Sequence, residues 1–209
     1  MGVGWTDPSS GREYALVGQT DGTVFVEVLD DGSLQYVGRL ATATEPSVWR
    51  DIKVIGNHAY IGSEAPDHGL QIFDLTQLRD ADPENPQEYS KLTAHFTGFG
   101  SSHNIVANEE TDLITAVGIE RRLKCRGGLW MGDVSNPARP QDAGCVSEDG
   151  YVHDAQCVIY RGPQQASQGQ EICFNYNEDA LTIVNIDRKA SPAQLSHTTY
   201  NGATYTHQG

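Results

Sequence analysis

The pentapeptide Leu70-Gln71-Ile72-Phe73-Asp74 is the stretch on which the predicted fold depends, because its pattern recurs three more times along the chain. Each copy opens on an apolar or β-branched residue and has Phe, Ile or Met at its centre. The other copies lie at residues 23–27 (TVFVE), 129–133 (LWMGD) and 181–185 (LTIVN), and successive copies begin about 50 residues apart. Short runs of such residues, bounded by Gly, Asn, Asp and Pro, predict β-strands.

A second short strand is expected before each copy, at residues 14–18, 59–63, 113–118 and 172–176. Innermost strands are expected ahead of these, at 52–54, 105–106 and 155–158. A unit of about 50 residues with four short strands is typical of a β-propeller blade. An ordinary all-β sandwich is the alternative, but it would show turn signals without this long period. The predicted fold class is therefore all-β, a β-propeller.

One domain is expected over residues 1–209, with about four blades at 1–48, 49–100, 101–150 and 151–205 and a strand stub at 206–209. The first repeat is predicted to lack its innermost strand. The stub could complete that blade and close a four-bladed ring. We favour part of a larger propeller, whose missing blades come from the rest of the chain or from another subunit.

Charge and hydropathy exclude two classes of partner. The 209 residues include 14 Lys and Arg against 28 Asp and Glu, a net charge of −14. Binding to a nucleic-acid backbone needs clustered cations, so no nucleic-acid partner is expected. No apolar run approaches the roughly 20 residues of a transmembrane helix, and the first residues do not have the pattern of a signal peptide.

Polar residues recur where the innermost strands begin, again about 50 residues apart. In a propeller these strands line a central channel, so equivalent positions on successive blades converge. Three imidazoles plus a carboxylate or amide oxygen could hold one divalent cation, such as Zn, Mn, Fe, Cu, Ni or Ca. The candidate metal ligands are Asp51, His103, His153, His207 and Gln208.

A structural interpretation of the same histidines stays open, because a His at the start of a strand can hydrogen-bond a neighbouring loop and seal the channel. Repetition by duplication would also copy such a residue. The remaining histidines, His58, His68, His95 and His197, lie outside this register and are predicted to be surface or loop residues.

The four cysteines allow three disulfide connectivities. We favour Cys125–Cys145 and Cys157–Cys173, because neighbouring strands of one blade bring these pairs within bonding distance. Disulfides indicate an oxidising compartment and hence an extracellular or cell-surface protein. Four reduced, buried thiols are the alternative.

The chain resembles the choice-of-anchor B family of exported bacterial proteins, whose sheets carry the LVIVD repeat. The resemblance covers nearly all 209 residues, and the segments that carry it are 5–18, 49–54, 98–104, 153–160, 171–175 and 205–209. It implies a β-propeller, secretion and surface display through a variable C-terminal anchor. It also implies a signal sequence, further strands and further blades outside residues 1–209. It implies a fold and a location rather than an activity.

The function expected from the sequence is non-catalytic: an exported or cell-surface propeller that binds a protein or carbohydrate through its loops and channel. No G-x-S-x-G, H-E-x-x-H, phosphate-binding or dinucleotide-binding motif occurs. The second hypothesis is a metal-dependent lyase- or hydrolase-like enzyme acting on an acidic polysaccharide, with Asp154 or Tyr151 as the base. A purely structural module is a third, and whether the protein is an enzyme stays open.

Overall fold

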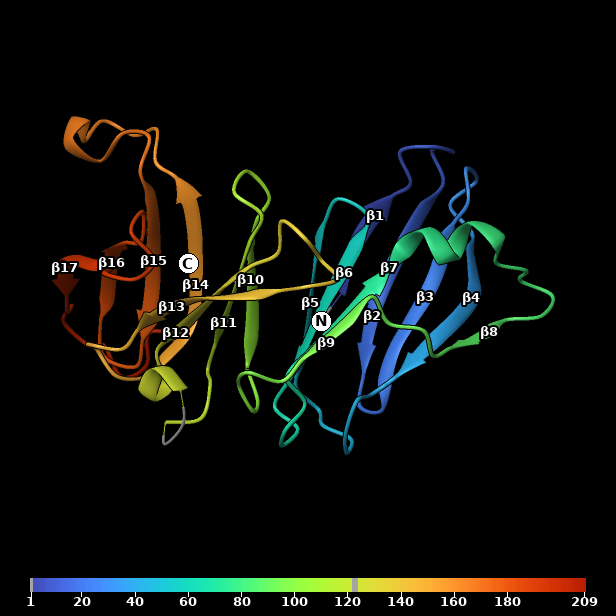
Figure 1. The fold of residues 1–209 in the computed structure, drawn as a ribbon, viewed down its shortest axis with the longest axis horizontal. Helices are drawn as coiled ribbons and strands as arrows, with labels where there is room; N and C mark the ends of the chain where they lie inside the picture. Colours follow the sequence, from blue (N-terminus) through green and yellow to red (C-terminus); the bar gives the residue numbers. More distant parts are fainter. Residues whose placement is uncertain (1, 122–123) are drawn as a thin grey trace. The chain divides into compact units, whose positions relative to one another are not determined.

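The computed structural model describes residues 2–121 and 124–209 (Figure 1). In the part of the chain described, the strands form four sheets of four or five strands, which confirms the predicted all-β class. The chain divides into two compact units, Met1–Ser101 and Ser102–Gly209, and each unit holds two sheets.

The first sheet of unit 1 has the strand order β1-β2-β3-β4-β8. Its strands are β1 (Gly2–Thr6), β2 (Glu13–Gln19), β3 (Gly22–Val28), β4 (Leu34–Ala41) and β8 (Gln87–Tyr89). Strands β1 to β4 are antiparallel, and β8 runs parallel to β4. The expectation that the first repeat lacks its innermost strand is wrong, because β1 pairs with β2 over its full length.

The second sheet of unit 1 has the order β5-β6-β7-β9. It consists of β5 (Arg50–Ile55), β6 (His58–Ser63), β7 (Leu70–Asp74) and β9 (Ala94–Phe96), and the 3₁₀ helix η1 (Leu75–Asp80) follows β7. Strand β8 belongs to the first sheet although it falls within residues 49–100. Its Tyr89 ring packs edge-on against Phe25 and Phe73, at 5.5 and 5.3 Å between centroids. A side chain on Gly38 would collide with the Gln87 carbonyl, so glycine permits this pairing.

Unit 2 contains two four-stranded antiparallel sheets, each with its strands in sequence order. One is formed by β10 (Asn104–Asn108), β11 (Leu113–Val117), β12 (Leu129–Asp133) and β13 (Gln141–Val146), with η2 (Lys124–Gly127) before β12. The other is formed by β14 (Val152–Ile159), β15 (Glu171–Asn177), β16 (Leu181–Asn185) and β17 (Ala193–Thr198), with η3 (Gln165–Ser167) in the β14–β15 connection. The strand stub predicted at residues 206–209 is not a strand in the structure.

The recurring pentapeptides form the third strand of each sheet, β3, β7, β12 and β16. Their side chains alternate between the two faces, as the period of a β-strand requires. In unit 1 the central residue of one pentapeptide meets the fourth residue of the next: the Phe25 and Phe73 rings stack with centroids 4.9 Å apart. In unit 2, Met131 and Val184 occupy the same positions of their pentapeptides and belong to one buried cluster. The repeat thus packs sheet on sheet within each unit.

Both disulfides have the predicted pairing and lie in unit 2. Cys157 and Cys173 are direct partners on β14 and β15, with Cα atoms 4.1 Å apart. Cys125 in η2 bonds Cys145 on β13, with a Cα separation of 5.2 Å. Each bridge closes a short loop within a single sheet, a constraint worth about 3 kcal/mol in the chain-entropy model.

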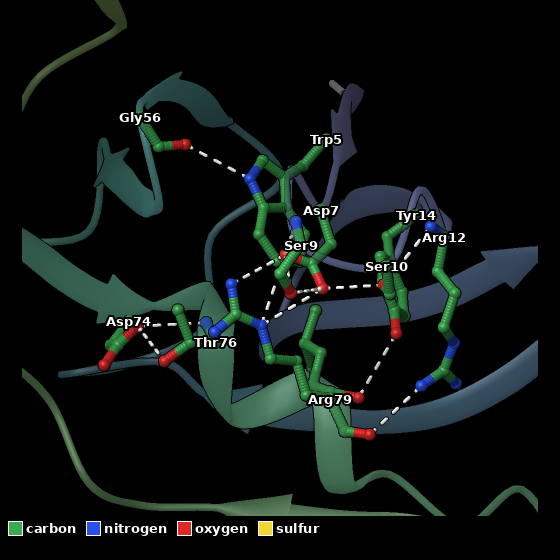
Figure 2. A network of polar contacts seen from close by, with 11 residues as sticks. Trp5, Asp7, Ser9, Ser10, Arg12, Tyr14, Gly56, Asp74, Thr76 and Arg79 are labelled. Atoms are coloured by element: carbon green, nitrogen blue, oxygen red, sulfur yellow. Dashed lines mark hydrogen bonds and ion pairs between the residues drawn. The ribbon is translucent and has the colours of Figure 1, made fainter.

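An ion pair fixes the β1–β2 turn against η1 in unit 1 (Figure 2). The Asp7 side chain is fully buried, and its carboxylate accepts from Nη2 of Arg79 at 2.7 Å and from Nε at 3.1 Å. Ser9 and Ser10 hydroxyls also donate to it. The Arg79 hydrogen bonds, with help from the two serines, hold the pKa of Asp7 well below its usual range, although burial opposes them.

Two further hydrogen bonds surround this ion pair. The Tyr14 hydroxyl donates to the Leu78 carbonyl at 3.3 Å, and the Trp5 indole N–H donates to the Gly56 carbonyl at 3.1 Å (Figure 2). The two rings stack at 5.4 Å between centroids. Strands of the first sheet are thereby tied to the second sheet and its helix by directed bonds as well as by apolar contact.

Asp7→Asn should weaken the protein at neutral pH and reduce its sensitivity to acid. A carboxylate whose pKa is lowered on folding stabilises the native state above about pH 4, and this contribution is lost as the pH falls further. Denaturant unfolding between about pH 7 and pH 2 should therefore show that the free energy of unfolding of the wild type falls with acid. The fall should be smaller for the variant. Asp30→Asn, at an exposed carboxylate, is the control. Identical pH profiles for Asp7→Asn and wild type would contradict the assignment.

Candidate functional site

Three of the predicted ligand histidines lie together in unit 2. His103 precedes β10, His153 is on β14, and His207 is in the segment that follows β17. The ring centroids of His103 and His153 are 4.3 Å apart, and those of His153 and His207 are 4.4 Å apart. The ring planes are tilted by 45° and 42°. Residues separated by about 50 positions therefore converge, as the repeat register predicts.

His153 is the central ring of this group and the most buried, at 5% exposure. Its Nδ1 donates to the backbone carbonyl of His207 at 2.9 Å, which places the proton on Nδ1 and leaves Nε2 with the lone pair. Burial lowers the pKa of His153, and the neighbouring His103 and His207 add to this effect, while the hydrogen bond and Asp154 oppose it. Burial and the two neighbouring rings therefore favour the neutral imidazole, whose proton lies on Nδ1.

Tyr205 completes the group, although the sequence interpretation did not select it. Its ring meets His153 edge-on, with centroids 5.2 Å apart, and it is 44% exposed. Thr206, between Tyr205 and His207, is buried: its N–H donates to the Glu178 carbonyl at 3.0 Å. This bond holds the segment in place while Tyr205 and His207 stay open to solvent. We call His103, His153, Tyr205 and His207 the His–Tyr cluster.

Gly118 positions one side of the cluster. Its φ is +63°, and a side chain there would collide with Cβ of His103 and crowd the Tyr151 hydroxyl. The Gly118 N–H donates to the Val152 carbonyl at 2.6 Å, and the His103 N–H donates to Val117 at 2.9 Å. Glycine at this position therefore allows β11 and the start of β14 to approach His103.

The two candidate bases lie near the cluster. The Tyr151 ring is covered by the Arg121 guanidinium at 4.6 Å, and Arg121 pairs with Glu178 at 2.7 Å. Asp154 follows His153 on β14 and is opposite Tyr176 in the strand register. Its charge raises the pKa of Tyr176, in addition to the larger effect of burial. Proton transfer by either residue stays a prediction.

The two remaining proposed ligands differ in their surroundings. Gln208 is exposed at the end of the chain. Asp51 belongs to unit 1, is 2% exposed, and accepts from the Ile52 N–H at 2.8 Å and from Nζ of Lys53 at 2.6 Å. Among the described residues, no three His, Cys, Asp or Glu side chains are arranged to hold a metal ion. The metal role of these residues stays a prediction.

His68 lies in the loop between β6 and β7, in agreement with the surface-or-loop interpretation, but it is not at the surface. It is fully buried in unit 1, where its Nδ1 donates to the Gly69 carbonyl at 3.0 Å and its Nε2 accepts from Nη1 of Arg50 at 2.9 Å. Arg50 is itself 4% exposed and also donates to Thr42 Oγ1 and to the Gln19 carbonyl. Burial is the main cause that lowers the pKa of His68 to about 4, and the Arg50 charge adds to it.

The other three histidines fit the surface or loop interpretation in part. His95 is exposed and donates through Nε2 to the His68 carbonyl at 2.7 Å, and His197 lies 3.4 Å from Asp149. His58 begins β6 and is half-buried, and burial lowers its pKa.

No protein-family model matches the chain, and no curated protein sequence is significantly similar to it. Among the described residues, no helix is both long and apolar enough to cross a membrane.

His68→Gln should remove a pH-dependent part of the stability. A base whose pKa falls from 6.5 to about 4 on folding stabilises the native state above pH 6.5, and this contribution is lost as the pH falls from 6.5 to 4. The loss can reach about 3 kcal/mol, since one pKa unit corresponds to about 1.4 kcal/mol. Glutamine can accept the Arg50 bond but does not titrate. In denaturant unfolding, the free energy of unfolding should fall more steeply between pH 6.5 and pH 4 for the wild type than for His68→Gln. His197→Gln, at an exposed histidine in unit 2, is the control. Equal slopes for His68→Gln and wild type would refute the assignment.

Proposed function

We propose that this chain is a β-propeller-type module, exported to the cell surface, that binds a protein or glycan ligand at the His–Tyr cluster. The observation that carries the proposal is the cluster itself. Side chains from three distant parts of unit 2 converge, and two of their rings stay open to solvent. Four sheets built on one repeated strand pattern support the assignment of the sheets as propeller blades.

The disulfides support export. All four cysteines are paired, each pair within one sheet. Structural disulfides of this kind form and persist in oxidising compartments. Membership of the choice-of-anchor B family agrees with this location and stays part of the proposal.

The chemistry of the cluster suits a ligand that offers both an apolar face and polar groups. Tyrosine combines a large apolar ring with a hydroxyl at low entropic cost, which is why it is enriched at binding surfaces. His207 adds a second exposed ring that can donate or accept a hydrogen bond. Sugar rings and aromatic or amide-rich peptide segments both have this character.

Tyr205→Ala combined with His207→Ala should reduce ligand binding at least about tenfold, because both exposed rings of the cluster are removed. The protein would be screened on glycan arrays and, in parallel, by pull-down from surface extracts, and hits would be quantified by calorimetry. His197→Ala, an exposed histidine on β17 outside the cluster, is the matched control and should bind like the wild type. Binding that survives the double substitution would rule out the cluster as the site.

A metal-dependent enzyme is the second candidate, favoured by one specific observation. Histidine ligands of metals commonly donate their other ring N–H to a backbone carbonyl, as His153 does to His207. In this alternative His103, His153 and His207 would hold a divalent cation such as Zn, Mn, Fe, Cu or Ni. The cation would acidify the proton beside the carboxylate of a uronate, and Asp154 or Tyr151 would accept that proton as the bond to the leaving sugar breaks.

Metal analysis distinguishes the two candidates. The enzyme hypothesis predicts about one equivalent of a transition metal per chain, lost in His207→Ala, whose exposed side chain can be removed without opening the core. Elemental analysis of protein exported into an oxidising compartment is the measurement, with His197→Ala as the control and circular dichroism to verify folding. No stoichiometric metal after incubation with each ion would exclude this candidate and leave the binding proposal in place.

A further inference from the structure

The repeated pentapeptides define two faces on every sheet. Side chains at the first and third positions point to one face, here the odd face, and those at the second and fourth positions point to the other, the even face. Within unit 1, the odd face of the first sheet packs on the even face of the second, as Phe25 does on Phe73. Within unit 2, Met131 on the odd face of its sheet and Val184 on the even face of the next belong to one buried cluster.

The odd face is open on only one of the four sheets in the described residues. At the third position, three pentapeptides have a side chain with 0% exposure: Phe25, Ile72 and Met131. The fourth has Ile183, which is partly exposed. Exposure at the first position follows the same pattern: Leu70 and Leu129 are fully buried, whereas Leu181 is partly exposed. The odd face of the β14–β17 sheet is therefore uncovered.

The even face is open on a different sheet. Val184 and Phe73, at the fourth position, are 2% and 0% exposed, whereas Val26 of the first sheet is partly exposed. At the second position, Trp130 is 0% exposed while Val24 is partly exposed. Within the described chain, the β1–β4 sheet is thus the one whose even face is uncovered.

Both open faces have exposed apolar side chains, although Arg39 and Glu13 also lie on the even face of the β1–β4 sheet. The odd face of the β14–β17 sheet has a hollow of about 440 Å³ floored by Phe174, Ile183 and Leu195, and Leu195 is 50% exposed. The β14–β15 connection, with Tyr160 and Gln170, forms one rim. On the β1–β4 sheet, Val17 and Tyr36 are 40% and 43% exposed beside Val24 and Val26.

We propose that a second copy of this chain covers these faces, with the odd face of β14–β17 in one copy packed on the even face of β1–β4 in the other. The contact would repeat the one that already joins neighbouring sheets inside each unit, with Ile183 in the place of Phe25 or Met131 and Val26 in the place of Phe73 or Val184. Burial of these apolar side chains drives the association.

Because one open face is odd and the other even, the contact is heterologous, and the same two faces stay available for further copies. This inference concerns assembly and does not depend on the ligand of the His–Tyr cluster.

Sedimentation equilibrium from about 1 to about 200 µM tests the proposal. The wild type should associate as the concentration rises. Ile183→Glu and Val26→Glu each place a carboxylate in one of the two faces and should weaken association at least about tenfold. Val48→Glu, at a valine that is 77% exposed and outside both faces, should associate like the wild type. Circular dichroism and thermal unfolding verify that each variant folds.

Mixing the two variants provides the decisive measurement. An Ile183→Glu chain keeps its open even face, and a Val26→Glu chain keeps its open odd face. Together they can make a single contact, so an equimolar mixture should form 1:1 pairs although neither variant associates alone. A wild type that stays monomeric throughout, an association that neither substitution weakens, or a mixture that stays monomeric would each overturn the proposal.

Discussion

The packing of the third residue of one pentapeptide on the fourth residue of the next is the contact around which each unit is built. In unit 1 it is the stack of Phe25 on Phe73, closed at its edge by Tyr89. In unit 2 the same positions hold Met131 and Val184, so aromatic rings are replaced by aliphatic side chains without a change in strand order. Each pentapeptide keeps at least one apolar side chain on each face of its strand. A strand of five residues can therefore pack against a neighbouring sheet on either face.

This dependence explains which parts of the fold could be predicted from the sequence. The strands β3, β7, β12 and β16 follow directly from the pentapeptides, and their partners follow from the alternation before them. Strand β1 could not be found in this way, because two of its five residues are glycines and its pairing depends on β2. Strand β8 lies in a segment rich in Pro, Asp and Glu, and only the docking of Tyr89 between two phenylalanines gives it a place in the first sheet.

In the candidate site, too, some residues could be predicted from the repeat and others depend on tertiary contacts. Spacing placed His103, His153 and His207 together, since equivalent positions in a repeat converge. Spacing could not reveal Tyr205, whose position depends on the buried Thr206, or Gly118, whose missing side chain admits His103. The loop position of His68 could be predicted, but its burial could not, for a related reason. The segment Asp67-His68-Gly69 resembles an exposed turn, and it is the buried Arg50, distant in sequence, that draws the imidazole into the core.

The two units achieve stability by different means, although one repeat builds both. Unit 1 relies on buried polar pairs, Asp7 with Arg79 and Arg50 with His68, whose strength depends on protonation. Unit 2 carries both disulfides, which acid leaves intact and reduction removes. It follows that a reducing environment should loosen the unit that holds the His–Tyr cluster and the open odd face, whereas acid acts on buried titratable groups in both units, such as His68 and His153. The candidate binding surface therefore lies on the unit whose stability depends on oxidised cysteines.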